Sequence, residues 1–138
     1  MDREAIIRNP DTYDTWHFAE ANRVGRTVWV AGQRGFDERD QIPRDPTIQA
    51  RIAFRQMERT LREAGATLDD VVSLTSYHTD MAHLDSFREV KDEFIRAPYP
   101  AWTIIGVSAL ASPEMLVEVC AIAVVGSGRH ATEHGLSR

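Results

Sequence analysis

The 138-residue sequence predicts an α+β fold, in which a mixed β-sheet carries two helices on one face. Two stretches, residues 47–64 and 80–95, repeat apolar residues at three- and four-residue steps, the period of an amphipathic helix. Short segments rich in β-branched, aromatic and other apolar residues flank them and are typical of strands. The predicted order is β-β-α-β-α-β-β. The chain is most simply one domain, residues 1–126, with a polar C-terminal tail, residues 127–138.

The N-terminal third is predicted to hold a β-hairpin between two loops. Residues 1–15 are polar and rich in turn formers, so we expect no regular element there. Residues 16–24 and 27–31 form the predicted hairpin, because a Gly-Arg pair suits the turn between them and the second strand is β-branched and aromatic. The charged segment 37–46, with two prolines, follows as a loop.

Two predicted helices enclose a third strand, residues 71–77. Thr47 suits the N-cap of the first helix, and Gly65 suits its C-terminal stop. The apolar stripe of this helix consists of Ala50, Ala53, Phe54, Met57, Leu61 and Ala64. Asp80 opens the second helix, which runs to about Ile95. Its predicted buried side is Leu84, Phe87, Val90 and Phe94.

Two apolar strands, residues 100–107 and 116–125, close the domain. The last strand is apolar on both faces: Val117, Val119, Ala121 and Ala123 on one, and Leu116, Cys120, Ile122 and Val124 on the other. Strands of this kind are usually buried on both faces. Because no helix remains to cover the second face, we expect another copy of the chain to cover it, with a ligand pocket at the interface.

Glu118 is a lone carboxylate in this last apolar strand. A buried carboxylate is costly unless it is paired or hydrogen-bonded, and the preceding strand offers Trp102 rather than a cation. One interpretation is a catalytic carboxyl whose pKa burial has raised. The other is a structural carboxylate that accepts backbone N–H bonds at a subunit interface.

The composition of the chain argues against a nucleic-acid-binding protein and against a membrane protein. The net charge is −5, and the arginines of the first predicted helix are interleaved with glutamates, so we expect a solvated helix face and no nucleic-acid partner. The longest apolar run, residues 119–125, is too short to cross a bilayer, and Met1 to Ala5 lack a secretory layout. We therefore expect a cytoplasmic protein without a membrane partner.

Few residues suggest metal or cofactor chemistry. The single cysteine, Cys120, excludes an internal disulfide and is interpreted as a core residue. His130 and His134 have zinc-compatible spacing but lack a third fixed ligand, so no metal site is expected. There is no phosphate-cradling glycine loop, and no cofactor is expected.

Several short motifs, in their order and spacing, resemble the Rid family, also called YjgF/RidA. They are Val24-Gly25, Gly32-Gln33, the segment from Glu63 to Val72, Thr79-Asp80-Met81, Pro100-Ala101 and the segment from Val117 to Val124. The resemblance implies a chorismate-mutase-like α+β fold assembled as a homotrimer, with a cleft for a small-molecule ligand between neighbouring subunits. It also implies hydrolysis of reactive imines and enamines to a carbonyl compound and ammonia.

The resemblance assigns roles to individual positions. Glu118 matches the glutamate that positions the attacking water, and Gln33 matches the Gly-Gln turn. Phe18 stands at the position of a cleft tyrosine. Trp102 stands at the position of an arginine that grips the substrate carboxylate, and Thr103 and Ile104 follow it as further substrate-binding candidates.

The exchange of arginine for Trp102 changes the expected substrate. An indole offers one N–H where a guanidinium offers a fork of donors, and losing that clamp costs on the order of several kcal/mol. The sequence therefore predicts an imine deaminase of an arginine-lacking branch, whose substrate is not a simple 2-imino acid. Trp102 could stack on such a ligand or pack an interface. Arg34 could replace the lost clamp, but we interpret it as a solvated residue beside a turn.

Two other functions remain open at this point. One is a non-catalytic trimer that keeps the cleft to hold a ligand. The other is an endoribonuclease, an activity historically attached to the family, which the acidic balance of the chain disfavours.

Overall fold

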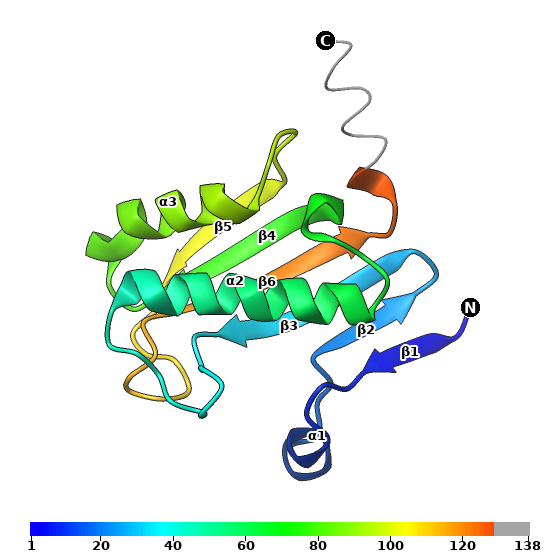
Figure 1. The fold of residues 1–138 in the computed structure, drawn as a ribbon, viewed down its shortest axis with the longest axis horizontal. Coiled ribbons are helices and arrows are strands. Elements are labelled where there is room, and N and C mark those ends of the chain that lie inside the picture. The colour runs from blue at the N-terminus through cyan, green and yellow to red at the C-terminus, as the bar shows by residue number, and fades with distance from the viewer. Residues whose placement is uncertain (129–138) are drawn as a thin grey trace.

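The structure, a computed structural model, describes residues 1–128 (Figure 1). Nearly all of the predicted tail, with His130 and His134, lies outside the described residues. The described chain forms one six-stranded sheet in the order β1-β2-β3-β6-β4-β5. Its strands are β1 (Arg3–Ile6), β2 (Ala21–Val24), β3 (Thr27–Arg34), β4 (Val71–His78), β5 (Ala101–Gly106) and β6 (Val117–Val124).

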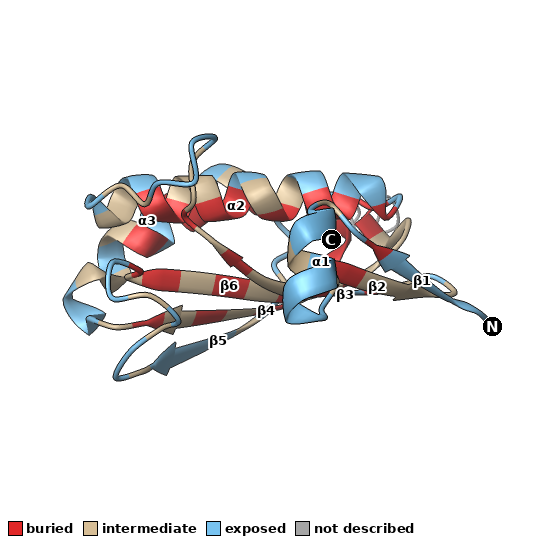
Figure 2. Ribbon diagram, turned by 90° about the horizontal axis from the view of Figure 1, so that it is seen from below, coloured by how far each residue is buried: buried red, intermediate tan, exposed pale blue. Residues whose placement is uncertain are grey.

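The sheet is mixed, as predicted. β4 and β5 run parallel, and all other neighbouring strands are antiparallel. Helices α2 (Pro46–Glu63) and α3 (Leu84–Phe94) lie over the same face, as Figure 2 shows in the side view. Their apolar stripes, which include Phe54, Met57 and Phe87, form the core with the sheet residues below them. The helices of the described chain include none long and apolar enough to cross a membrane.

The N-terminal segment differs from the prediction. Residues 1–15, expected to be a loop, contain β1 and most of helix α1 (Pro10–Trp16), and the strand predicted from residue 16 begins only at Ala21. Asn9 caps α1 by accepting a hydrogen bond from Thr12 N at 3.2 Å. The residues of α1 bury nothing and β1 buries only Ile6, so neither element has the apolar pattern by which the others were predicted.

Both long helices begin differently from the prediction. Asp45, and not Thr47, is the N-cap of α2: its carboxylate accepts a hydrogen bond from Thr47 N at 2.8 Å. Asp80 caps a short 3₁₀ turn, Met81–His83, and α3 itself starts at Leu84. The predicted apolar stripes are unaffected by these shifts of a few residues.

The two faces of the sheet have different surroundings. The residues of β6 that point toward the helices are buried: Val117, Val119, Ala121 and Ala123. The residues that alternate with them, including Cys120 and Ile122, are only half-buried in the single chain. Trp29, the register partner of Ile122, is 47% exposed on this second face. The strand predicted to be apolar on both faces therefore has one covered and one uncovered side.

Gln49 holds the loop that follows β5 against helix α2. Its fully buried side chain donates hydrogen bonds to Pro43 O at 2.7 Å and Glu114 O at 2.9 Å, and accepts one from Leu116 N at 2.9 Å. Three backbone groups thus depend on one amide. The bridge sets the position of residues 111–115 beside the end of β3.

Replacing this amide is expected to destabilise the fold. Gln49→Ala leaves two carbonyls and one N–H without their partner, which we expect to lower the free energy of unfolding by about 2–4 kcal/mol in urea titrations. Gln41→Ala, at an exposed side chain of the neighbouring loop, is the control and should change it by less than about 0.5 kcal/mol. Equal losses of stability in the two variants would contradict the proposed role of the Gln49 hydrogen bonds in stabilising the fold.

Candidate functional site

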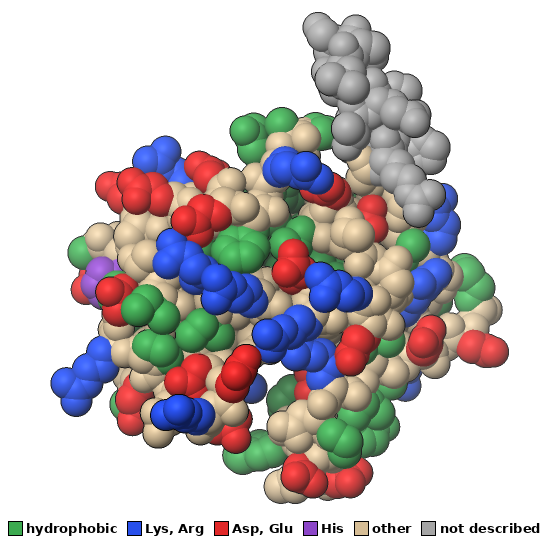
Figure 3. Space-filling model, viewed as in Figure 1, with side chains coloured by type: hydrophobic (Ala, Val, Ile, Leu, Met, Phe, Trp, Pro, Cys, Tyr) green, Lys and Arg blue, Asp and Glu red, His purple; other side chains and the backbone are tan. Residues whose placement is uncertain are grey.

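A pocket of about 760 Å³ lies beside the second half of β3. Strand β2 starts at Ala21, which pairs with Val30, so β3 beyond Val30 has no β2 residue beside it. The pocket occupies this edge, and the space-filling view is hollowed there, between α1 and the loops (Figure 3). Its lining includes Arg8, Trp16, Phe18, Glu20, Gly32, Gln33, Arg34, Phe36, Asp37, Asp40, Gln56 and Met115.

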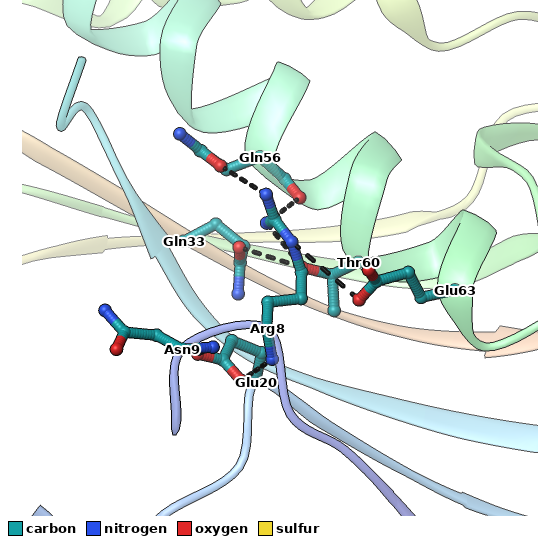
Figure 4. Close-up of polar contacts among 7 residues, drawn as sticks. All are labelled: Arg8, Asn9, Glu20, Gln33, Gln56, Thr60 and Glu63. Atoms are coloured by element: carbon teal, nitrogen blue, oxygen red, sulfur yellow. Dashed lines mark hydrogen bonds and ion pairs between the residues drawn. The ribbon is translucent and has the colours of Figure 1, made fainter. Parts of the chain in front are cut away.

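Gln33 and Arg8 build the wall between the pocket and α2. The buried Gln33 amide donates to Ala31 O at 2.9 Å and accepts from Thr60 Oγ1 at 3.3 Å. The Arg8 guanidinium donates to Gln56 O at 3.2 Å, to Gln56 Oε1 at 3.0 Å and to Thr60 Oγ1 at 3.0 Å (Figure 4). These polar groups of Gln33 and Arg8 therefore stabilise the wall of the pocket through hydrogen bonds within the chain.

Aromatic side chains supply the apolar part of the pocket. Trp16, at the end of α1, is 75% exposed, and Phe18 two residues later is 40% exposed. Phe36, beyond the end of β3, lies under the Arg34 guanidinium, whose Cζ is 5.1 Å from the ring centroid. The pocket therefore combines flat apolar surfaces with a cation.

Glu118 lies on the uncovered face of the sheet, between two polar neighbours. Its register partners are Arg34 on β3 and Tyr77 on β4. Burial raises the pKa of the Glu118 carboxyl, and the charge of Arg34 opposes this rise. Within the described chain the carboxylate accepts no hydrogen bond, so the sheet offers it no structural partner.

Gly32 lets the Glu118 carboxyl lie next to the wall of the pocket. A Cβ added at Gly32 would lie 2.5 Å from Glu118 Oε2, so the carboxyl group occupies the space that a side chain at position 32 would need. Gly32 itself lines the pocket. The absence of a side chain at this position therefore places a titratable oxygen beside the pocket wall.

Trp102 lies elsewhere. Its Nε1–H donates to Ser76 Oγ at 2.9 Å, and its ring packs under α3, with a centroid 6.0 Å from that of Phe87. Lys91 Nζ is 4.8 Å from the indole. Trp102 therefore faces the helices, opposite to Glu118, and β4 separates their two strands.

The structure therefore divides the predicted site residues into two groups. Phe18 and Gln33 line the pocket, and Glu118, which does not line it, lies next to the lining residue Gly32. Trp102, Thr103 and Ile104 belong to the edge strand β5 and do not line it. One chain does not bring the two groups together.

Two residues near Glu118 were not predicted as part of the site. Arg34, interpreted as solvated, is half-buried and lines the pocket, and Tyr77 is the cross-strand neighbour of Glu118. Strand alternation alone places Arg34 on one side of its strand. Only the pairing of β3 with β6 shows that this is the side on which Glu118 lies.

Among the described residues, no group of three or more His, Cys, Asp or Glu side chains is arranged to hold a metal.

A family model described as Endoribonuclease L-PSP matches residues 10–125. The chain belongs to this family, the YjgF/Rid family. It is 37% identical over 111 residues to the RutC family protein YjgH of Escherichia coli, covering 79% of this chain and 85% of that protein. It is 28% identical over 110 residues to a 2-iminobutanoate/2-iminopropanoate deaminase of Dermatophagoides farinae, covering 78% of this chain and 85% of that protein.

Solved structures of the YjgF/Rid family confirm the predicted fold. A member from Mycobacterium tuberculosis has a TM-score of 0.81 at 32% sequence identity, covering 90% of this chain and all of that one (100%). RidA from an Antarctic Psychrobacter has a TM-score of 0.75 at 31% identity, covering 78% of this chain and 88% of that one. The family resemblance drawn from the motifs is confirmed by these matches.

The contact between Gly32 and Glu118 predicts different outcomes for two nearby glycines. Gly32→Ala should push the flexible Glu118 carboxyl aside, change the free energy of unfolding by no more than about 1 kcal/mol, and lower the pKa of Glu118 toward its ordinary value as the carboxyl becomes more exposed. Carbon-detected NMR titration of Glu118 measures the pKa.

Gly35→Ala is the comparison. Its added Cβ would lie 2.8 Å from Gln49 Cα, and helix backbone cannot rotate away, so we expect a loss of about 1–3 kcal/mol or more in the same urea titration. An unchanged pKa of Glu118 in Gly32→Ala would contradict the placement of the carboxyl.

Proposed function

We propose that this protein is a hydrolytic deaminase of reactive imines and enamines, in which Glu118 positions and deprotonates the attacking water. The observation that carries the proposal is the Glu118 carboxyl beside pocket-lining Gly32, half-buried and without a hydrogen-bond partner in the described chain. Membership of the YjgF/Rid family supports it, as does the similarity to a 2-iminobutanoate/2-iminopropanoate deaminase.

The chemistry needs one group that both takes and returns a proton. Glu118 accepts a proton from the water as its oxygen adds to the carbon of the C=N bond, and returns that proton to the nitrogen, which gives a carbinolamine. Glu118 then takes the proton of the carbinolamine hydroxyl and passes it to the nitrogen as the C–N bond breaks, so ammonia and a carbonyl compound leave. Burial raises the pKa of the Glu118 carboxyl, which makes it a stronger base than an ordinary glutamate and so better suited to transfer a proton in both directions.

We further propose that the substrate is larger than the small 2-imino acids that form from serine and threonine. The single N–H of Trp102 is bonded to Ser76, so position 102 offers no guanidinium clamp, which supports the assignment of this chain to an arginine-lacking branch. The pocket volume and its aromatic lining suit a substrate of more than a few heavy atoms.

We propose that the active form is a homotrimer. The uncovered sheet face, with Trp29 and Ile122, supports an interface with further copies of the chain. In such an assembly the edge strand β5 of a neighbouring copy, with Thr103 and Ile104, closes the site against Glu118, while Trp102 stays packed under α3 of its own chain. This arrangement would bring residues that one chain keeps apart to the same ligand.

Removing the carboxylate should abolish most of the activity. Glu118→Gln keeps the shape of the side chain but cannot accept a proton, so we expect kcat/KM to fall by about 100- to 10,000-fold. The assay follows imines formed in situ by amine and amino-acid oxidases, each relative to its spontaneous hydrolysis. Glu89→Gln, on the exposed surface of α3, is the control.

The pH profile gives a second measurement. Glu118 acts as its carboxylate, so kcat/KM should fall as the pH drops through the raised pKa, at a higher pH than for an ordinary glutamate of about 4.3. No acceleration of any imine by the native protein would refute the deaminase and favour a ligand-binding trimer.

The trimer is tested by placing a charge on the uncovered face. Trp29→Glu should dissociate the assembly to monomers in sedimentation-equilibrium runs, because the carboxylate would be desolvated in an apolar interface. Ile48→Glu, on the surface of α2, is the control: Ile48 is 44% exposed, close to the exposure of Trp29. Dissociation by both substitutions, or by neither, would contradict the proposed interface.

A further inference from the structure

The pocket contains two arginines, and only one of them is available to a ligand. The Arg8 guanidinium is held by Gln56 and Thr60, with Glu63 3.9 Å away. The Arg34 guanidinium makes no hydrogen bond or ion pair with any residue from 1 to 128. Its one close partner is the face of Phe36, which leaves the N–H groups at its edge free to bind an anion.

Arg34 stands next to the proposed catalytic carboxyl. The two residues are register partners on adjacent antiparallel strands, whose side chains on the same face lie about 4.5–5.5 Å apart at Cβ. The charge of Arg34 lowers the pKa of Glu118 against the larger effect of burial, yet the two side chains form no ion pair within 4.0 Å. Arg34 therefore lies close enough to act on the same substrate without being neutralised by Glu118.

The acidic side chains of the pocket limit what Arg34 can hold. Glu20 accepts hydrogen bonds from Arg8 N and Asn9 N, and Asp37 Oδ1 accepts two from backbone N–H groups of its own loop. With Asp40 also present, the pocket carries more negative than positive side chains. A ligand with a single carboxylate fits this balance better than a polyanion such as a phosphorylated or nucleic-acid substrate.

We propose that Arg34 is the anion-binding residue of this pocket, and that the substrate is an imine with one carboxylate and a bulky aromatic or apolar group. The inference rests on the proposed deaminase function and names its substrate class. A guanidinium binds a carboxylate through two parallel N–H bonds, and the Arg34 guanidinium lies over the Phe36 ring with its Cζ 5.1 Å from the centroid. Trp16 and Phe18 offer the surface for the bulky group.

Because Arg34 and Glu118 are adjacent, the carboxylate lies on, or within a few bonds of, the imine carbon. The reaction then takes an imino acid and one water to an oxo acid and ammonia. The C–O bond forms first, to give the carbinolamine, and the C–N bond then breaks with loss of ammonia, so no oxidant or reductant is consumed. The carboxylate clamp thus acts from β3 of the pocket, while position 102 holds an indole.

A matched pair of imines tests this assignment. An amino-acid oxidase converts L-phenylalanine to an aromatic imine with a carboxylate, and an amine oxidase converts 2-phenylethylamine to the corresponding imine without one. Catalase removes peroxide, and each rate is divided by the spontaneous rate. We expect the native protein to accelerate the carboxylate imine more strongly than the neutral one.

Substitutions at position 34 should change this preference. We expect Arg34→Met to lower kcat/KM for the carboxylate imine by about 10- to 100-fold more than for the neutral imine, with Arg34→Lys between the two. Arg39→Met, at an exposed side chain outside the pocket lining, is the charge control and should leave both rates unchanged. Circular dichroism and thermal unfolding establish that each variant is folded.

The outcomes separate this inference from the function on which it rests. Equal losses for the two imines, or no loss for either, would overturn the role of Arg34 while the deaminase stands. If the native protein accelerates neither of these two imines, the proposed substrate class fails, and calorimetric binding of 3-phenylpropanoate decides the anion site alone. Binding that Arg34→Met weakens by about 10-fold or more supports the anion site, and binding that is absent or unaffected overturns it.

Discussion

The pairing of β3 with β6 is the constraint on which the site depends. Val30 and Gln33 are three residues apart, so regular alternation would place them on opposite faces, yet both are buried and both pair with buried residues of β6. The register shift between them resolves the conflict. It lets Gln33 reach Thr60 on α2, places Gly32 against Glu118, and sets Arg34 opposite Glu118. A single irregularity in one ladder thus builds both the buried wall and the charged side of the pocket.

Much of the fold was predictable because burial leaves a periodic pattern. The stripes of α2 and α3 and the two-faced β6 follow from three- and four-residue or two-residue spacing. β1 and α1 bury almost nothing, so they leave no such pattern. Their evidence is local chemistry: Asn9 ahead of Pro10 is an N-cap followed by proline in the first turn, a signal that could have identified α1.

The site was predictable in part. Glu118 stood out as a lone carboxylate in an apolar strand, the family resemblance added Gln33 and Phe18, and the structure places all three at or beside one pocket. Arg34 could not be assigned in this way, because its importance comes from a cross-strand partner 84 positions later in the chain, and sequence periodicity contains no register between strands. The face of the sheet on which the Trp102 side chain lies cannot be predicted from the sequence for the same reason. Alternation shows that neighbouring residues of β5 lie on opposite faces, but not which of them face the helices.

The side on which Trp102 lies explains why an anion would be bound from another strand. Ser76 Oγ accepts the indole N–H and lies 2.8 Å from His78 Nε2, and both Ser76 and His78 are buried. Burial also lowers the pKa of His78, which favours a neutral imidazole in this cluster. Lys91 already places a positive charge beside the indole. A guanidinium in place of Trp102 would lie beside the positive charge of Lys91 and would lack the flat apolar surface that packs against Phe87, so packing under α3 and anion binding are competing uses of position 102. Where packing occupies that position, the cation for the substrate has to come from elsewhere, and Arg34 is the pocket arginine whose N–H groups are free among the described residues.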